Sequence, residues 1–494
     1  MSLVVNTNMS SLTAQRSIAG SDRALETAME RLSSGKRINS ASDDAAGLAI
    51  VERMTAQIKG LNMATRNAND GIAMTQSIEG ALVEVTDMLQ RLRELAVQSA
   101  NDTNSGTDRG YLQEEVVLLQ AELSRVASNT RYNGQLVLDG NYTSKQLQVG
   151  TEGGESISFS IDSVAANSLG AYTLATAGSA PLGDSTTATI GQDSAPANGT
   201  TSGTLTVMGG GAAESVTVAA NAEAKAVAAG INAKTGTTGV TADAKTHAEI
   251  AFAATGSYTF KLNGTAVGTF SASATSVADA VVKINAISGT TGVVAVGNTA
   301  GTKIMLTDSS GADIEIENTA TTAGNDIVVQ AYAHDGTTAI SGTVTLDDAA
   351  TSGDEFTRVK GNISLSSSSV FSVVDTGGTN KYFATGAATL SSVSNVNIGT
   401  QAGANSSISV IDGAIEKVSS MRAKLGAIEN RLEHTVSNLM NISENTQDSR
   451  SRIQDADFSV ESANLAKAQV LQQVGAAMLT QANARPQLVL QLLQ

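Results

Sequence analysis

Few side chains in this sequence could carry out chemistry. The three histidines, His247, His334 and His434, are isolated in the sequence, and none lies in a recognisable metal-binding spacing. Cysteine is absent, which excludes disulfides and thiolate metal sites. Because a metal site needs several converging ligands, we interpret each histidine as a surface or lightly packed residue.

The other candidate groups also have simpler interpretations. Asp43-Asp44 and Asp347-Asp348 are paired carboxylates, and we interpret them as turn or capping residues. Gly209-Gly210-Gly211 follows an expected strand but lacks the basic residue and helix start of a phosphate cradle, which favours a hairpin turn. The chain has neither a G-x-x-x-x-G-K-[ST] loop nor a G-x-S-x-G elbow. The sequence therefore predicts no catalytic, cofactor or metal site and no enzyme activity.

The composition of the chain excludes further classes of function and partner. The 494 residues, enough for about three domains, carry a net charge of −16, only 3% aromatic residues and 3 prolines. This charge argues against nucleic acid as a partner, because phosphates select basic surfaces. No run of about 18 apolar residues exists, so no membrane span is expected. The N-terminus also lacks the basic and apolar regions of a secretory signal.

The elements that organise the chain are helices with seven-residue periodicity. Within residues 408–442, Val418, Leu425, Leu432 and Leu439 recur at a strict seven-residue step. A second apolar set follows three residues later, which is the a/d seam of a coiled coil. This helix would be about 50 Å long. At its start, Ile408, Ile411 and Ile415 break the register, so we expect less regular packing there, and we expect the helix to end in a break over residues 445–455.

Its partners must come from the first 130 residues, where similar apolar patterns occupy residues 14–32, 50–72, 78–99 and 112–126. We expect the last two to pack against the long helix. Gly35 is well placed as a left-handed C-cap of the first. After the fourth, residues 136–138 and 146–149 are expected to form strands flanking Asp139-Gly140-Asn141, a hairpin signal.

A final helix is expected over residues 460–484, with apolar residues around much of its circumference. We expect it to pair with the helix of residues 14–32. That pair has more apolar surface than two helices can bury, so the remainder is predicted to meet other copies of the molecule. The residues predicted for this polymerisation core are Ile18, Leu25, Leu32, Val470, Val474 and Met478.

The middle of the chain has a different residue pattern, with short Val/Thr/Ser strands separated by Gly- and Asn-rich turns. It contains an internal repeat, in which the sequence that begins at Ile231-Asn232 returns at Ile284-Asn285. Each copy places strands before an Ala-rich helix that leads into the Ile-Asn pair. Two tandem α+β modules are therefore predicted.

The fold class that follows is multi-domain, with α-helical coiled-coil domains formed by the N- and C-terminal segments together and β-rich or α+β outer domains inserted between them. The expected divisions are residues 1–43 with 456–494 as the terminal helix pair, 44–175 with 401–455 as the coiled-coil domain with its hairpin, 176–202 with 309–400 as a β-rich outer domain, and 203–255 and 256–308 as the repeat modules.

The ends of the chain resemble those of bacterial flagellin. The signature stretches near the N-terminus are Glu30 to Asn39, Asp43 to Gly47, Arg66 to Gly71 and Gln90 to Gln98. Near the C-terminus they are Arg452 to Phe458 and Pro486 to Leu493. The resemblance covers roughly the first 170 and last 95 residues, and the Ile-Asn repeats look like hook IN modules of some flagellins.

This resemblance implies a structural subunit that self-assembles into the extracellular filament used for swimming. It also implies export by the flagellar type III route, with an export chaperone, the filament cap and hook-associated proteins as partners. The alternative function is a hook-associated junction protein or a secreted adhesin that shares the terminal helices.

One further implication concerns a host protein. Arg91, Leu95 and Glu115 match the positions through which flagellins of this type resemble ligands of Toll-like receptor 5. An ordinary role is equally open for them, with Leu95 packing beside the seam and Arg91 and Glu115 as helix-surface charges that also serve subunit packing.

Overall fold

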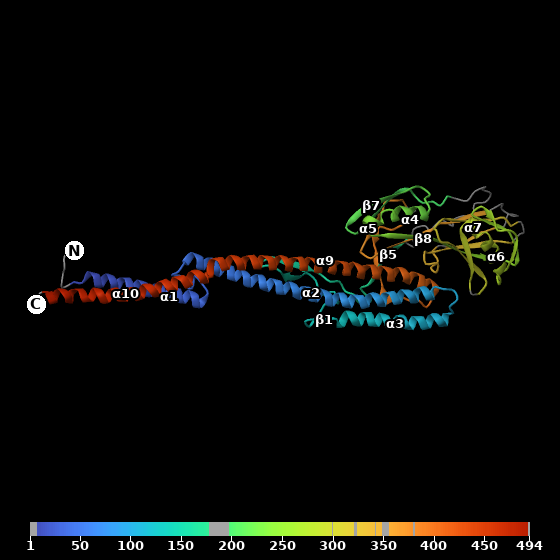
Figure 1. Ribbon diagram of the computed structural model, residues 1–494. Helices are drawn as coiled ribbons and strands as arrows, with labels where there is room; N and C mark the ends of the chain where they lie inside the picture. Colours follow the sequence, from blue (N-terminus) through green and yellow to red (C-terminus); the bar gives the residue numbers. More distant parts are fainter. Residues whose placement is uncertain are drawn as a thin grey trace. The chain divides into compact units, whose positions relative to one another are not determined.

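The computed structural model describes residues 7–176, 197–298, 300–320, 324–340, 342–347, 355–378 and 381–492, with only the backbone for 485–492. The chain separates into two compact units, and Figure 1 labels its helices and several of its strands. Unit 1 is Met1–Gln76, Ser144–Phe159 and Gly426–Gln494, and unit 2 is Ser77–Thr143 and Ser160–Leu425. The division differs from the predicted domain boundaries, which stay predictions. Of the predicted outer domain, residues 177–196 lie outside the described residues.

The helices from both ends of the chain are longer than predicted. They are α1 (Met9–Ser34), α2 (Ala45–Ser99), α3 (Gly106–Asn129), α9 (Gln401–Gln454) and α10 (Phe458–Leu492). The two patterns at residues 50–72 and 78–99 belong to the single helix α2. The break predicted over residues 445–455 was wrong, because α9 continues to Gln454 as a polar surface helix that includes an i,i+4 ion pair between Arg452 and Asp448.

Local capping sets where these helices begin and end. Gly35 adopts φ 69° at the end of α1, which confirms the left-handed cap. Asp44 accepts the backbone N–H of Gly47 at 2.8 Å at the start of α2, and Asp43 accepts N–H groups of the preceding turn. The turn and capping interpretation of this carboxylate pair is therefore confirmed.

In unit 1, α9 packs against α2 along its heptad seam. Leu439 contacts Leu61 and Ala64. Seven residues earlier in α9, Leu432 packs with Ala68. A small hairpin of β3 (Lys145–Gln148) and β4 (Ser156–Phe159) covers this point through Leu147 and Ile157. A Cβ added to Gly71 would approach the Leu147 side chain to 2.5 Å, so the glycine lets the hairpin lie directly on α2.

The seam remains regular in unit 2. Ala404, Ser407, Ile411, Ala414, Val418 and Leu425 are all buried, and their spacing alternates between three and four residues, with Met421 completing the series. The expectation of less regular packing near residues 408–415 was wrong, because small residues occupy the seam there and the larger isoleucines suggested a different register. Arg93 and Arg422 also form ion pairs across the helices, with Asp412 and Glu79.

The hairpin predicted around Asp139-Gly140-Asn141 was also wrong. The tight turn is instead Asn133-Gly134, both with positive φ, between β1 (Arg131–Tyr132) and β2 (Gln135–Leu136). The predicted strand at residues 146–149 pairs with β4, not with residues 136–138. Asn-Gly is the stronger two-residue turn signal, and Asp139 instead accepts a hydrogen bond from the N–H of Asn141 in a local turn.

The rest of unit 2 is β-rich and antiparallel. Its central sheet has the order β13-β14-β8-β19-β5-β22, with β16 also on β8 and β17 on β16. Those strands are β5 (Gly170–Ala175), β8 (Thr241–Phe252), β13 (Val293–Gly297), β14 (Lys303–Asp308), β16 (Ile327–Tyr332), β17 (Val344–Leu346), β19 (Asn362–Ser367) and β22 (Thr389–Ser392).

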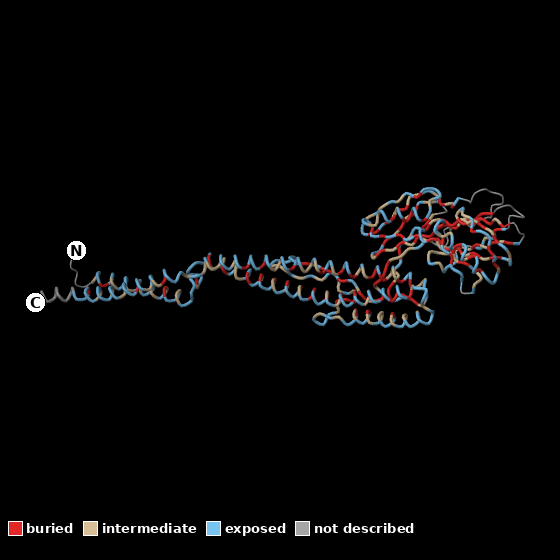
Figure 2. The backbone as a smooth tube through the Cα atoms, turned by 45° about the vertical axis from the view of Figure 1, so that its right-hand side comes forward, coloured by how far each residue is buried: buried red, intermediate tan, exposed pale blue. Residues whose placement is uncertain are grey.

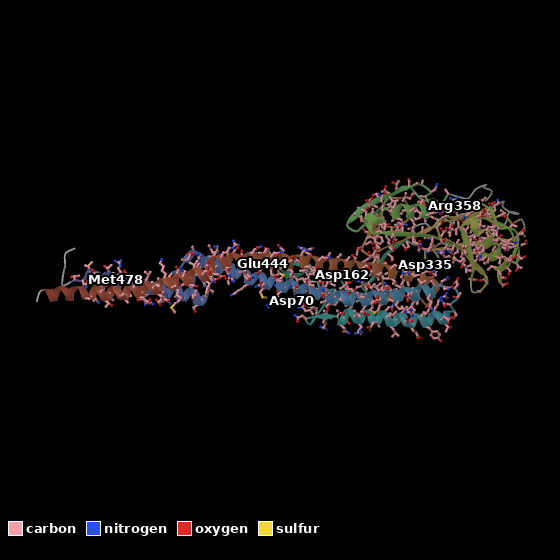
Figure 3. All side chains as sticks on the ribbon, in the orientation of Figure 1. Asp70, Asp162, Asp335, Arg358, Glu444 and Met478 are labelled. Carbon is pink, nitrogen blue, oxygen red and sulfur yellow. The ribbon has the colours of Figure 1, made fainter. Side chains whose placement is uncertain are left out.

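Smaller sheets complete unit 2. One has the order β11-β10-β15-β18, a second pairs β12 with β9, and a third has the order β21-β20-β6-β7. Their strands are β6 (Gly203–Gly209), β7 (Ala212–Val218), β9 (Gly256–Tyr258), β10 (Phe260–Leu262), β11 (Thr265–Ala266), β12 (Phe270–Ala272), β15 (Ile314–Asn318), β18 (Glu355–Val359), β20 (Ser372–Asp375) and β21 (Gly386–Ala387). Arg358 of β18, labelled in Figure 3, pairs with Glu315 of β15.

Both repeat modules have the predicted layout of strands followed by a helix and the Ile-Asn pair. The first contains α4 (Ala224–Asn232) and α5 (Thr235–Thr238), and the second contains α6 (Ala278–Ala286) and α7 (Ser288–Thr291). The modules share β8, and each extends beyond its predicted limits. The first core includes Ile231 and later residues such as Phe383, while the second includes Ile284 and Val359. The strands after residue 308 complete both cores.

Truncation of the seam should destabilise unit 1 strongly. We expect Leu432→Ala to lower the free energy of unfolding by about 2–5 kcal/mol, because it leaves a cavity at a fully buried position. Met440→Ala, at an exposed position of the same helix, is the control and should change stability by less than about 0.5 kcal/mol. Urea unfolding followed by helical circular dichroism measures both, and equal effects would contradict this packing.

Candidate interaction surfaces

The helices α1 and α10 lie side by side along their length (Figure 1). The α1 residues turned to α10 are Ala14, Ile18, Ser21, Leu25, Ala28 and Leu32, all buried or half-buried. The facing α10 residues are Leu465, Ala468, Gln472, Gly475, Leu479 and Ala482. Close approach needs small residues, since a Cβ on Gly475 would come within 2.8 Å of Ile18.

Polar links set the register of this pair. Arg31 forms an ion pair with the largely buried Glu461 at 3.1 Å, and Gln472 donates to Asp22 at 2.7 Å. At the other end Ser11 donates to Asn483 at 2.8 Å. Polar groups inside a helix seam favour one register, because any slip would leave them unpaired.

An apolar stripe of α10 faces away from α1. Val470, Val474 and Met478 are 57%, 53% and 59% exposed, and their i, i+4, i+8 spacing puts them on one stripe of α10. Figure 3 labels Met478 on this helix. Further large exposed apolar residues of the two helices are Met9, Leu12, Met29, Phe458, Val460 and Leu471. Figure 2 shows few buried residues here and many in the strands of unit 2.

The six residues predicted for the polymerisation core therefore divide into two groups. Ile18, Leu25 and Leu32 lie half-buried in the intramolecular seam, whereas Val470, Val474 and Met478 lie on the outside. The sequence reading missed the seam of α10 itself. Its signal is a seven-residue recurrence of small residues, Ala468, Gly475 and Ala482, which counting large apolar side chains does not detect.

The predicted receptor and subunit surface lies in unit 2, where α3 packs beside α2. Arg91 Nε donates to Glu115 Oε1 at 2.8 Å, and Arg91 also pairs with Glu94 at 3.0 Å. Both members of the interhelical pair are about half exposed. Leu95 is fully buried, so it supports the helix from within and does not present its side chain at this surface.

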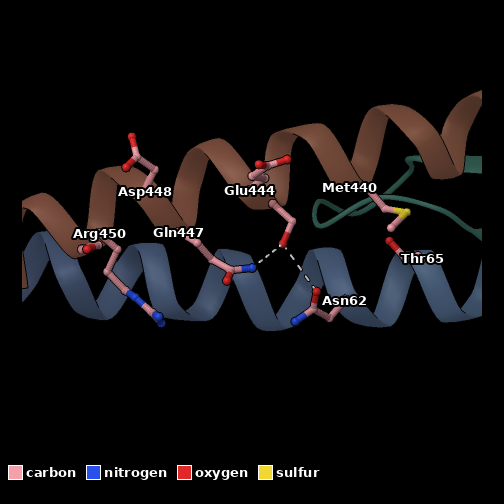
Figure 4. A pocket seen from close by; sticks show the side chains of 9 residues that line it. Asn62, Thr65, Met440, Glu444, Gln447, Asp448 and Arg450 are labelled. Carbon is pink, nitrogen blue, oxygen red and sulfur yellow. Dashed lines mark hydrogen bonds between the residues drawn. The ribbon is translucent and has the colours of Figure 1, made fainter.

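The seam residues Val418, Leu425, Leu432 and Leu439 are buried inside the protein. In unit 1 an open groove of about 690 Å³ lies between α2 and α9 beside this seam (Figure 4). Ser443 accepts a hydrogen bond from Gln447 at 3.1 Å in this groove and donates one to Asn62 at 3.5 Å. Its lining is mostly polar, with Met440 as the exception.

Folding brings two of the three histidines together. His247 of β8 lies beside His334, whose Nε2 is 3.0 Å from Asp243 Oδ2, while His434 is exposed on α9. Among the residues that the structure describes, no group of three or more His, Cys, Asp or Glu could hold a metal ion.

Gly209–Gly211 form a hairpin turn between β6 and β7. Of the predicted carboxylate pair Asp347-Asp348, Asp348 lies outside the described residues.

The surroundings of His247 favour its neutral ring. Burial, together with the charges of His334 and Lys245, lowers the pKa of His247 to about 4. Burial alone raises the pKa of Asp243, but hydrogen bonds and charges from His334 and Lys245 outweigh it and lower that pKa to about 2.

Within the described part of the chain, no helix is long and apolar enough to cross a membrane.

Comparison with known protein families identifies the family to which this chain belongs. The family described as bacterial flagellin N-terminal helical region matches residues 5–143, and the C-terminal helical region matches residues 408–493. The flagellin hook IN motif matches residues 204–256, which is the first repeat module. The chain belongs to the bacterial flagellin family. It is therefore a structural subunit of the flagellar filament, an extracellular assembly.

Relatives cover the flagellin chain from end to end. B-type flagellin of Pseudomonas aeruginosa is 40% identical and flagellin of Salmonella typhimurium is 36% identical, each over 100% of both chains. Among solved structures, FliC from Burkholderia pseudomallei is similar at 18% identity and a TM-score of 0.30, over 73% of this chain and 99% of that one.

Acidification should destabilise the β-rich part of this flagellin. The imidazole of His247 stays neutral in the folded protein. As pH falls from about 6.5 to 4, this ring is therefore protonated in the unfolded state but not in the folded state, which favours unfolding. The depressed pKa of Asp243 adds a further loss as pH falls from 3.8 toward 2. Urea unfolding of unit 2 should show roughly 1–3 kcal/mol less stability at pH 4.5 than at pH 7. His247→Gln should flatten this slope, and an unchanged slope would contradict the assignment.

Proposed function

We propose that this flagellin polymerises through the outer apolar face of the α1–α10 pair. The observation that carries the proposal is the exposed stripe of Val470, Val474 and Met478, on a helix whose opposite face already pairs with α1. These side chains are a little over half exposed, so burying the rest of each against a neighbouring copy would contribute about 0.8–1.7 kcal/mol. Several per subunit are enough to offset much of the entropy lost on association.

The polar seam complements this face. The ion pair of Arg31 with Glu461 and the bonds of Gln472 and Ser11 hold the two helices in one register within a single chain. The pair therefore presents one arrangement of its outer face to incoming subunits, which a regular polymer requires.

Export by the flagellar type III route belongs to the same proposal, with the export chaperone, the cap and hook-associated proteins as partners. The absence of cysteine supports it, because no disulfide would have to form before or after passage of an unfolded chain. The alternative role, a hook-associated junction protein or a secreted adhesin, has less support, because the relatives that match the whole chain are flagellins.

A charge on the outer stripe should block assembly. We expect Val474→Asp to abolish elongation from filament fragments, because the carboxylate would be buried unpaired between subunits. Gln473→Asp, at an exposed polar position of the same helix, is the matched control and should elongate. Electron microscopy of seeded reactions measures the length of polymer.

Monomer circular dichroism shows whether α10 survives the substitution. Elongation by Val474→Asp at the control rate would contradict the proposed interface. Short, capped ends formed by the unaltered chain would instead favour the junction role.

A second proposed function is recognition by Toll-like receptor 5 through Arg91 and Glu115. It is favoured by their exposed ion pair, which holds the guanidinium at a defined place on the joined surface of α2 and α3. The pair leaves further guanidinium N–H groups available to a partner's carboxylates or carbonyls. The buried Leu95 would contribute only by keeping α2 in place.

Arg91→Ala should weaken receptor activation by monomeric protein, measured in a reporter assay. The matched control is Arg93→Ala, because Arg93 is equally exposed and also forms an ion pair, with Asp412. We expect about a tenfold shift in half-maximal concentration for Arg91→Ala, consistent with the 1.5–3 kcal/mol range for a charged hydrogen bond. Equal signalling by both variants and the unaltered chain would refute this role.

A further inference from the structure

The repeated Ile-Asn pair performs the same backbone contact in both modules. Asn232 Nδ2 donates to the carbonyl of Ala242 at 2.8 Å, and its Oδ1 accepts the N–H of the same residue at 2.7 Å. Asn285 bonds both groups of Ala295 in the same way, at 2.9 and 2.8 Å. Each side-chain amide thus occupies the place that the backbone of a neighbouring strand would take.

The two contacts differ in what they cover. Ala242 lies in the first half of β8, residues 241–245, which pairs with β19 on one side only, because β14 and β16 pair with residues 246–252. This stretch carries the charged pair of Asp243 and Lys245, which protects a sheet edge by itself. Ala295 lies in β13, the terminal strand of the sheet, which pairs with β14. Asn285 therefore sits on an open sheet edge, where unpaired backbone groups invite a further strand.

The remainder of this edge is suited to such pairing. The backbone groups of Val293 and Ala295 face outward, since alternate residues of an antiparallel strand bond to opposite sides. Thr291 Oγ1 accepts the N–H of Val293 at 3.3 Å, which covers one more donor. The strand reads Val-Val-Ala-Val-Gly without a charge, and Val294 and Val296 are 50% and 57% exposed.

We propose that the outer edge of β13 is a latent interaction surface for the same edge of a second copy, and that the Asn285 amide keeps it closed. Two identical edges pair antiparallel about a two-fold axis without any other change. The exposed valines of the two strands would then lie side by side on one face and bury each other. Natural sheet edges are protected in comparable ways by charges, bulges or covering groups.

In a subunit that assembles into a filament, closing the β13 edge would prevent unwanted pairing between copies. Subunits joined in one polymer hold their outer modules near one another, at a high effective concentration. An open β13 edge would link these copies at a place unrelated to the helical interface.

Asn285→Ala should open the edge, with Asn232→Ala as the matched control that removes the same two bonds from a strand segment carrying the charges of Asp243 and Lys245. Sedimentation velocity on full-length, freshly depolymerised protein should show concentration-dependent dimers for Asn285→Ala and monomer for Asn232→Ala. Hydrogen exchange at Ala295 should become about tenfold faster in dilute Asn285→Ala, and slow again as concentration rises. Exchange at Ala242 in the control should be fast at every concentration.

A second substitution separates edge pairing from general unfolding. Val296→Lys in the Asn285→Ala background places a charge on the pairing face and should restore the monomer without restoring stability. Asn285→Gln, which keeps an amide of greater length, is the milder variant if the alanine disrupts the module, and it should dimerise more weakly. A monomeric Asn285→Ala with normal circular dichroism, or dimers that persist with Val296→Lys, would overturn the proposal.

Discussion

The arrangement of this flagellin depends on heptad pairing between helices from opposite ends of the chain. A helix with an apolar stripe cannot remain unpaired in water, and the partners of α9 and α10 are α2 and α1. Everything between those helices must therefore leave and return at the same place. The antiparallel pairing of β5 with β22 closes this insertion, since it joins the strand that enters the outer region to the strand that leaves it.

Stabilising groups are distributed differently along the two helix pairs. The α2–α9 seam buries leucines within a single chain and so holds that chain together. The α1–α10 seam contains Ser, Gln and Gly, while its valines and methionines face outward. A chain organised in this way keeps much of its hydrophobic driving force for contacts with other subunits. In the outer modules the opposite holds, because the aromatic residues Phe252, Tyr258, Phe260 and Phe270 are collected in one core.

Much of the helical architecture could be predicted from periodicity and end signatures. The predicted pairings of both terminal helices and the left-handed cap at Gly35 rest on strong, local signals. The failures have physical causes. Small seam residues such as Ala404 and Ser407 carry little hydrophobic signal, so the register near residue 408 was misjudged. Residues 445–454 are polar enough to resemble a loop, yet nothing in them interrupts a helix that already has a partner.

The sequence alone determined the family, the long helices, the repeat and the absence of any recognisable catalytic motif, because these follow from spacing and residue type within short stretches. Tertiary structure decided which side of α10 faces α1 and therefore which residues remain for assembly. It also decided that Leu95 is buried, that Arg91 meets Glu115, and that Asn232 and Asn285 each cover a side of a strand that no other strand pairs with. These outcomes depend on partners distant in sequence, which come together only when the helices and strands pack.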